Sequence, residues 1–190
     1  MKGGVNKRLK NLTLGAVLSA LGVAIIALGG VIEVLDLSVA AIASFICVFA
    51  VIELGGIYPW LIFAVTGILS IVLIPSNLGG WCYILFFGYF PILKEKIERL
   101  KKPLAWVIKM LIGNVAFALL LFGFGTITYG TGLGFVELVN KVFETDFGTA
   151  MVVAVIVMVE ALFVVYDIAL TRIITFYLKR LRHRFKFLNK

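Results

Sequence analysis

Four polar or charged side chains interrupt two long apolar runs in the second half of the chain, and they are the residues best able to do chemistry there. Glu160 and Asp167 lie seven residues apart in the later run, which places them on about the same face of a helix. Lys109 and Asn114 lie in the earlier run. Ionisable groups at membrane depth are costly and usually face a bundle interior or a cavity. Such groups can pair with one another or contact a bound ligand.

The depths of these residues predict two pairs. If the two runs form antiparallel neighbouring helices, Lys109 and Asp167 lie at similar depth from the inner ends, and so do Asn114 and Glu160. We therefore expect a Lys109–Asp167 ion pair and a buried Asn114–Glu160 contact. Both pairs can be purely structural, and Asn114 and Glu160 are also candidates for ligand contact. A proton relay would require more such groups than this run offers.

Glycines and aromatic residues gather at the C-terminal end of the earlier run. The stretch GFGTITYGTGLGF, residues 123–135, contains Gly125 and Tyr129, which are candidate ligand-binding residues. Glycine backbone can approach a ligand closely, and aromatic rings can stack on a planar ligand. Trp81 could join them, although a tryptophan at this place is also typical of the aromatic belt at a membrane interface. The glycine-rich stretch is equally consistent with a flexible loop.

Small residues recur along the first apolar run with two spacings. Glycines repeat every seven residues and form a ridge: Gly15, Gly22 and Gly29. Four alanines lie on roughly the opposite face: Ala16, Ala20, Ala24 and Ala27. The first three repeat every four residues and form the alanine strip. Small residues let helices approach closely in lipid, where packing drives association. One face can pack within this protein and the other against a partner helix, or both can pack internally.

These residues must be positioned by helices that cross a membrane. The chain has 190 residues, of which 62% are hydrophobic and 15% charged, and a soluble domain could not bury so much apolar surface. We predict an all-α polytopic membrane protein that forms a single integral membrane domain over residues 1–190. Six transmembrane helices are expected at about residues 12–32, 36–52, 57–74, 79–93, 104–128 and 148–178, followed by a basic tail at 179–190.

The basic residues predict the orientation of these helices. With both termini in the cytoplasm, all of the 18 lysines and arginines except Lys141 fall in or beside inner connections. Cytoplasmic connections of membrane proteins carry such an excess. The net charge of +8 therefore reflects topology, and we expect no nucleic-acid binding. The basic tail can lie on anionic lipid headgroups or dock on a partner.

Motifs of known enzymes and metal sites are absent from the sequence. Cys47 and Cys82 form no CxxC pair, and His183 is the single histidine, so we expect neither a disulfide framework nor a metal site. There is no GxSxG elbow, no HExxH and no P-loop. We therefore expect a protein that is not an enzyme and holds no cofactor. Coupling to ATP would require separate subunits.

The helix count, the cytoplasmic termini, the length and the AxxxA strip of Ala16, Ala20 and Ala24 together resemble the substrate-binding S components of energy-coupling factor (ECF) transporters. The stretch FFGYFPILKEKIERL, residues 86–100, is also similar to small bacterial membrane proteins grouped with S components. The resemblance implies that the alanine strip contacts a transmembrane coupling subunit, and that separate ATPase subunits supply the energy. It further implies that a vitamin-type small molecule is captured near the outer side of a bacterial plasma membrane.

A scaffold is the alternative to the capture subunit. Rod-shape membrane proteins look like S components in helix count, and a non-catalytic assembly protein of that kind would use the same small faces for protein contacts. The sequence determines neither the ligand nor the oligomeric state.

Overall fold

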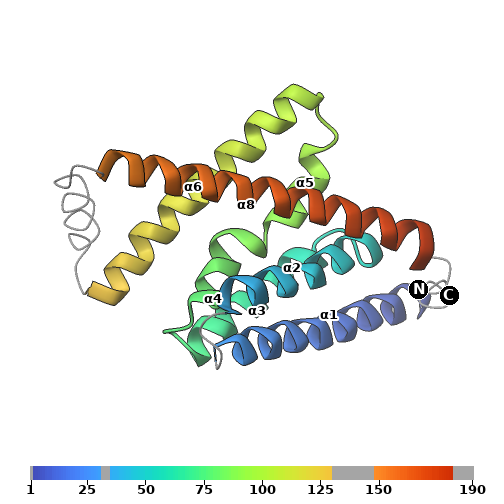
Figure 1. The fold of residues 1–190 in the computed structure, drawn as a ribbon. Helices are drawn as coiled ribbons and strands as arrows, with labels where there is room; N and C mark the ends of the chain where they lie inside the picture. The colour runs from blue at the N-terminus through green and yellow to red at the C-terminus, as the bar shows by residue number, and fades with distance from the viewer. Residues whose placement is uncertain (1, 31–34, 130–147, 182–190) are drawn as a thin grey trace. The chain divides into compact units, whose positions relative to one another are not determined.

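The computed structural model describes residues 2–30, 35–129 and 148–181, and these ranges are helical apart from short turns (Figure 1). The chain divides into two compact units, Met1–Phe135 and Val136–Lys190. Among the described residues the first unit holds every helix up to residue 129, and the second holds the long helix that follows. The predicted all-α class is confirmed.

Three helices form the N-terminal part of the first unit: α1 (Lys2–Gly29), α2 (Asp36–Glu53) and α3 (Tyr58–Leu73). Helix α1 packs against both α2 and α3. Asp36 lies in the first turn of α2, where a carboxylate interacts favourably with the positive end of the helix dipole. Helix α2 ends before Gly55 and Gly56, whose φ angles of 61° and 58° lie in the left-handed region that glycine adopts readily.

The expected helix at 79–93 is interrupted. It consists of α4 (Leu78–Cys82), a π-helical turn η2 (Tyr83–Phe87) and α5 (Phe90–Ile97). The wide turn is closed by Gly88, whose amide donates to the Tyr83 carbonyl at 2.7 Å. A Cβ atom at Gly88 would lie 2.6 Å from Cδ2 of Phe63, so the backbone here approaches the α3 aromatic ring more closely than any other residue type would allow. Helix α5 then extends to Ile97, beyond the expected end.

Two long helices complete the described chain. Helix α6 (Lys102–Tyr129) belongs to the first unit and follows α5 after a short turn at residues 98–101. Helix α8 (Gly148–Phe176) belongs to the second unit and continues into a π-helical turn, η3 (Tyr177–Leu181). The basic tail beyond residue 181, with His183, lies outside the described residues.

Three of the described helices contain stretches long and apolar enough to cross a membrane, as expected of a multi-pass membrane protein. These stretches are Arg8–Gly29, Asp36–Glu53 and Lys102–Leu120. Helix α3 is also apolar but shorter. Described helices lie at all six of the expected ranges. Six membrane crossings and cytoplasmic termini stay predictions.

Candidate functional site

The glycine ridge of α1 packs inside the first unit. All three glycines are buried, and a Cβ atom at Gly22 would lie 2.8 Å from Cγ2 of Thr66 on α3. A Cβ atom at Gly29 would lie 2.7 Å from Cγ1 of Val39 on α2. Contacts this short do not occur between real side chains, so the close approach of α1 to α2 and α3 depends on these glycines.

The contact between α1 and α3 also contains buried hydroxyl groups. The Thr66 hydroxyl donates to the backbone carbonyl of Ser19 on α1 at 3.4 Å, and the Ser70 hydroxyl donates to the Thr66 carbonyl at 2.7 Å. Ser19, Thr66 and Ser70 are all buried. Hydroxyl groups that bond to backbone carbonyls cost little inside a helix bundle and allow close packing.

The alanine strip of α1 faces outward. Ala16, Ala20 and Ala24 are all exposed, and the larger exposed side chains of Val17 and Leu21 flank them. In a membrane such a surface contacts either lipid or another helix. Contact of the strip with a coupling subunit stays a prediction.

Trp81 lies in α4 and contacts the turn that joins α3 to α4. Its indole N–H donates to the Pro75 carbonyl at 2.9 Å, and the side chain is half-buried.

The neighbouring Asn77 was not among the candidate residues, yet it makes more hydrogen bonds than Trp81 does. Its side chain accepts from the Gly79 amide at 2.7 Å, which caps α4, and donates to the Ile26 carbonyl of α1 at 2.8 Å. An asparagine directly before a helical run is a recognisable N-cap signal.

An aromatic cluster connects α3 to the π-helical turn. The Phe63 ring lies 6.0 Å from the rings of both Tyr83 and Tyr89, and 6.2 Å from that of Trp60. The Tyr83 hydroxyl lies 3.1 Å from Sγ of Cys47 on α2, and both side chains are fully buried. Buried tyrosines usually find a partner for the hydroxyl group. This cluster anchors η2 to its neighbours.

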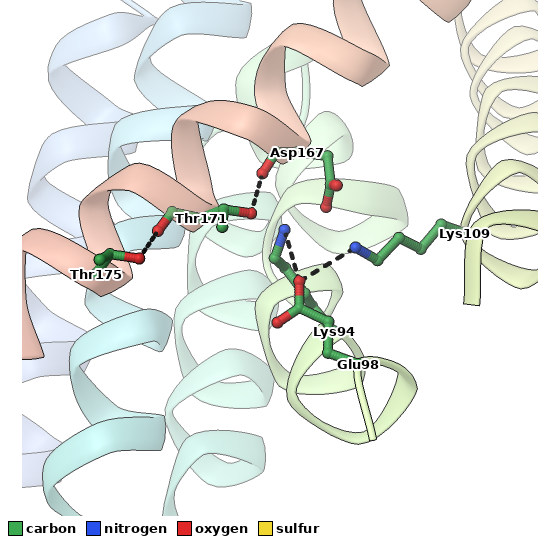
Figure 2. A network of polar contacts seen from close by, with 6 residues as sticks. All are labelled: Lys94, Glu98, Lys109, Asp167, Thr171 and Thr175. Atoms are coloured by element: carbon green, nitrogen blue, oxygen red, sulfur yellow. Dashed lines mark hydrogen bonds and ion pairs between the residues drawn. The ribbon is translucent and has the colours of Figure 1, made fainter. Parts of the chain in front are cut away.

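Lys109 belongs to a charged cluster with Glu98 and Lys94 that we did not predict from the sequence. Its ammonium group donates to Oε1 of Glu98 at 3.2 Å, and the Lys94 ammonium lies 3.2 Å from the same oxygen (Figure 2). The Lys94 side chain is 1% exposed, that of Lys109 is 7% exposed and that of Glu98 is 44% exposed. The Lys94–Glu98 pair could have been predicted from its i, i+4 spacing, whereas nothing in the spacing indicates the contact with Lys109.

The other expected polar residues lie on α6 and α8. Asn114 is exposed, and its side-chain amide donates to the Met110 carbonyl at 3.1 Å. On α8 the Thr171 hydroxyl donates to the Asp167 backbone carbonyl at 2.8 Å. The two expected pairs, Lys109–Asp167 and Asn114–Glu160, each join residues of the two units, and both stay predictions.

Gly125 and Tyr129 fall in the last turns of α6. The remainder of the glycine-rich stretch, residues 130–135, lies outside the described residues, so its role as a ligand-covering loop stays a prediction. Within the described ranges, no group of three or more His, Cys, Asp or Glu side chains is placed to hold a metal ion.

Comparison of the chain with family models, with curated proteins and with solved structures gives no match. The support for a function therefore comes from the residues themselves and from their arrangement. The two small-residue faces of α1 are the clearest part of that arrangement, since one is buried against α2 and α3 and the other is exposed.

Proposed function

We propose that this chain is the membrane-embedded substrate-capture subunit of a vitamin-type ECF importer. In this proposal it docks through Ala16, Ala20 and Ala24 on a separate transmembrane coupling subunit. The observation that carries the proposal is the exposure of this strip on a helix whose glycine ridge is already used for internal packing. A second small-residue face that is exposed, as this one is among the described residues, is suited to a partner helix.

The proposal assigns the remaining parts of the transport reaction to other molecules. ATPase subunits hydrolyse ATP, the coupling subunit transmits the motion, and this chain binds a small-molecule ligand from the outer side. The six helical segments cross a bacterial plasma membrane with both termini in the cytoplasm. The chain itself is not an enzyme, and Trp81, Asn114, Gly125, Tyr129 and Glu160 are the residues proposed to contact the ligand.

Docking is tested by enlarging the strip. Ala20→Leu and Ala24→Leu place bulky side chains where a partner backbone would approach, and they leave the internal packing unchanged because both positions are exposed. Val115→Leu, at an exposed position of α6, is the matched control. We expect the alanine variants to lose co-purification with the coupling and ATPase subunits, while the control retains it. Equal co-purification of all variants would remove the strip from the docking surface.

Ligand capture is tested by a thermal-shift screen of purified protein against B vitamins, their precursors, purines and aromatic amino acids. A ligand at one hundred times its Kd stabilises the folded state by about 2.7 kcal/mol, which raises the Tm by several degrees. We expect one class of compound to produce such a shift. If folded protein responds to no compound, the scaffold is favoured over the capture subunit.

A further inference from the structure

Three exposed lysines lie around the turn between α5 and α6. Lys96 is near the end of α5, Lys101 lies in the turn, and Lys102 is the first residue of α6. Backbone hydrogen bonds from Arg99 to Lys96 at 3.3 Å and from Ala105 to Lys101 at 2.9 Å hold the segment in an ordered conformation. The three positive charges are therefore held close to one another along the chain, on the surface of the first unit.

The carboxylates of this segment are engaged with other cations. Glu95 pairs with Arg99, and Glu98 pairs with two buried lysines. Within the part of the chain that the structure describes, the side chains of the three exposed lysines form no ion pair. The segment 94–102 carries five cations and two carboxylates, which leaves a net positive charge.

The turn lies where a candidate membrane span begins. The stretch Lys102–Leu120 of α6 is long and apolar enough to cross a membrane, and a helix that crosses along this stretch places the turn at the level of the lipid headgroups. In the first turns of the span, Leu104 and Trp106 are exposed. Tryptophan is typical of the membrane interface. Exposed cations beside exposed apolar side chains are typical of surfaces that contact anionic lipid.

We propose that the turn between α5 and α6 is a binding surface for anionic phospholipids. The ammonium groups of Lys96, Lys101 and Lys102 attract the negatively charged headgroup, and Leu104 and Trp106 contact the acyl chains beneath it. A zwitterionic headgroup carries no net charge and is bound more weakly. This inference requires that α6 crosses the membrane, and it does not depend on the proposed transport function.

The proposal is tested by lipid-specific quenching of Trp106 fluorescence. The full-length protein with Trp60→Phe and Trp81→Phe keeps Trp106 as its only tryptophan. It is reconstituted in equal amounts of phosphatidylglycerol and phosphatidylcholine, with brominated acyl chains on one lipid or the other. Bromine quenches only a nearby indole, so the two preparations together give the lipid preference at this site.

We expect a preference for phosphatidylglycerol of about fivefold or more, because each lysine near the membrane surface attracts anionic lipid. Equal quenching by the two lipids in folded protein would overturn the proposal. That result would favour an acidic protein surface as the partner of the lysines.

Substitution of the lysines separates a site at the turn from a general effect of positive charge. The variant Lys96→Gln/Lys101→Gln/Lys102→Gln should show about equal quenching by the two lipids. A matched control replaces by glutamine three exposed cations of α1, α8 and η3, and so changes the net charge by the same amount: Arg8, Arg172 and Lys179. We expect the control to keep most of the preference at Trp106. Equal losses in the two variants would contradict a site at the turn.

A subtraction keeps the proposal testable if the protein with a single tryptophan does not fold. Trp106→Phe retains Trp60 and Trp81, so the difference in quenching between the wild type and this variant is the contribution of Trp106. We expect this difference to be larger when phosphatidylglycerol carries the bromine. A difference that is the same for the two lipids would overturn the proposal.

Discussion

The side-chain amide of Asn77 donates a hydrogen bond to the backbone carbonyl of Ile26 at 2.8 Å, and this contact joins the turn after α3 to the last turns of α1. The Ile26 carbonyl also accepts from the Gly30 amide at 3.2 Å, so Asn77 supplies a second donor to this carbonyl near the end of α1. The same side chain caps α4 by accepting from the Gly79 amide. One buried residue thus stabilises the ends of two helices.

Asn77→Ala should destabilise the protein by about 1–3 kcal/mol, because it removes both side-chain hydrogen bonds and takes from the buried Gly79 amide the acceptor that caps α4. Asn77→Asp should cost at least as much, since aspartate keeps the cap of α4 but buries a carboxylate whose second oxygen faces the Ile26 carbonyl oxygen in place of the amide donor. Unfolding of the detergent-solubilised protein by SDS measures both. Thr13→Ala removes an exposed hydroxyl contact with the Leu9 carbonyl and should change the free energy of unfolding by less than about 0.5 kcal/mol. Equal losses for Asn77→Ala and Thr13→Ala would show that the Asn77 contacts are not stabilising.

Alanine substitutions along the glycine ridge should have graded effects. Gly22→Ala and Gly29→Ala introduce contacts below 3 Å with Thr66 and Val39, so each should destabilise the protein by about 1–3 kcal/mol. Gly15→Ala should be tolerated, because the nearest atom to its Cβ is Cγ1 of Ile62 at 3.7 Å. Thermal unfolding of the three variants measures the order. A Gly15 variant as unstable as the other two would contradict the packing of α1 described above.

The two cysteines should be protected from thiol reagents in the folded protein. Cys47 and Cys82 are free thiols with 0% and 3% of their surface exposed. A reagent can reach them only when the surrounding helices open, which should slow labelling on the order of a hundredfold or more relative to the SDS-unfolded chain. Leu100→Cys, in the exposed turn after α5, should label rapidly under the same conditions and serves as the positive control. Rapid labelling of the native cysteines would show that α2 or α4 is not packed as described.

The helix positions could be predicted closely because the apolar composition of the sequence implies a lipid environment. In lipid every backbone N–H and C=O must be satisfied internally, so an apolar run of sufficient length has to be a helix. The expected range 36–52 corresponds to α2 at Asp36–Glu53, and 57–74 corresponds to α3 at Tyr58–Leu73. The interruption at Tyr83–Phe87 could not be predicted, because it depends on how closely Gly88 approaches Phe63 of another helix.

For the candidate sites, too, the sequence identified individual residues, whereas their partners depended on the tertiary structure. The sequence identified Lys109 as a buried cation that needs a partner, and the structure places Glu98 within 3.2 Å of it. In the sequence, Glu98 lies in a basic connection that is typical of a solvent-exposed segment. Its position beside a buried lysine depends on how sharply the chain turns at residues 98–101. Trp81 was also identified, but the contact of its indole N–H with Pro75 depends on the conformation of a single turn.

By itself the sequence determined the class of protein, the helical segments and the two small-residue faces of α1, because composition and residue spacing specify which surfaces a helix presents. The tertiary structure decided which of those faces is buried. Gly22 lies against Thr66 and Gly29 lies against Val39, whereas Ala20 is exposed. The physical reason is that helix packing depends on close contacts between residues far apart in the chain, and spacing along one helix carries no information about which neighbour it meets.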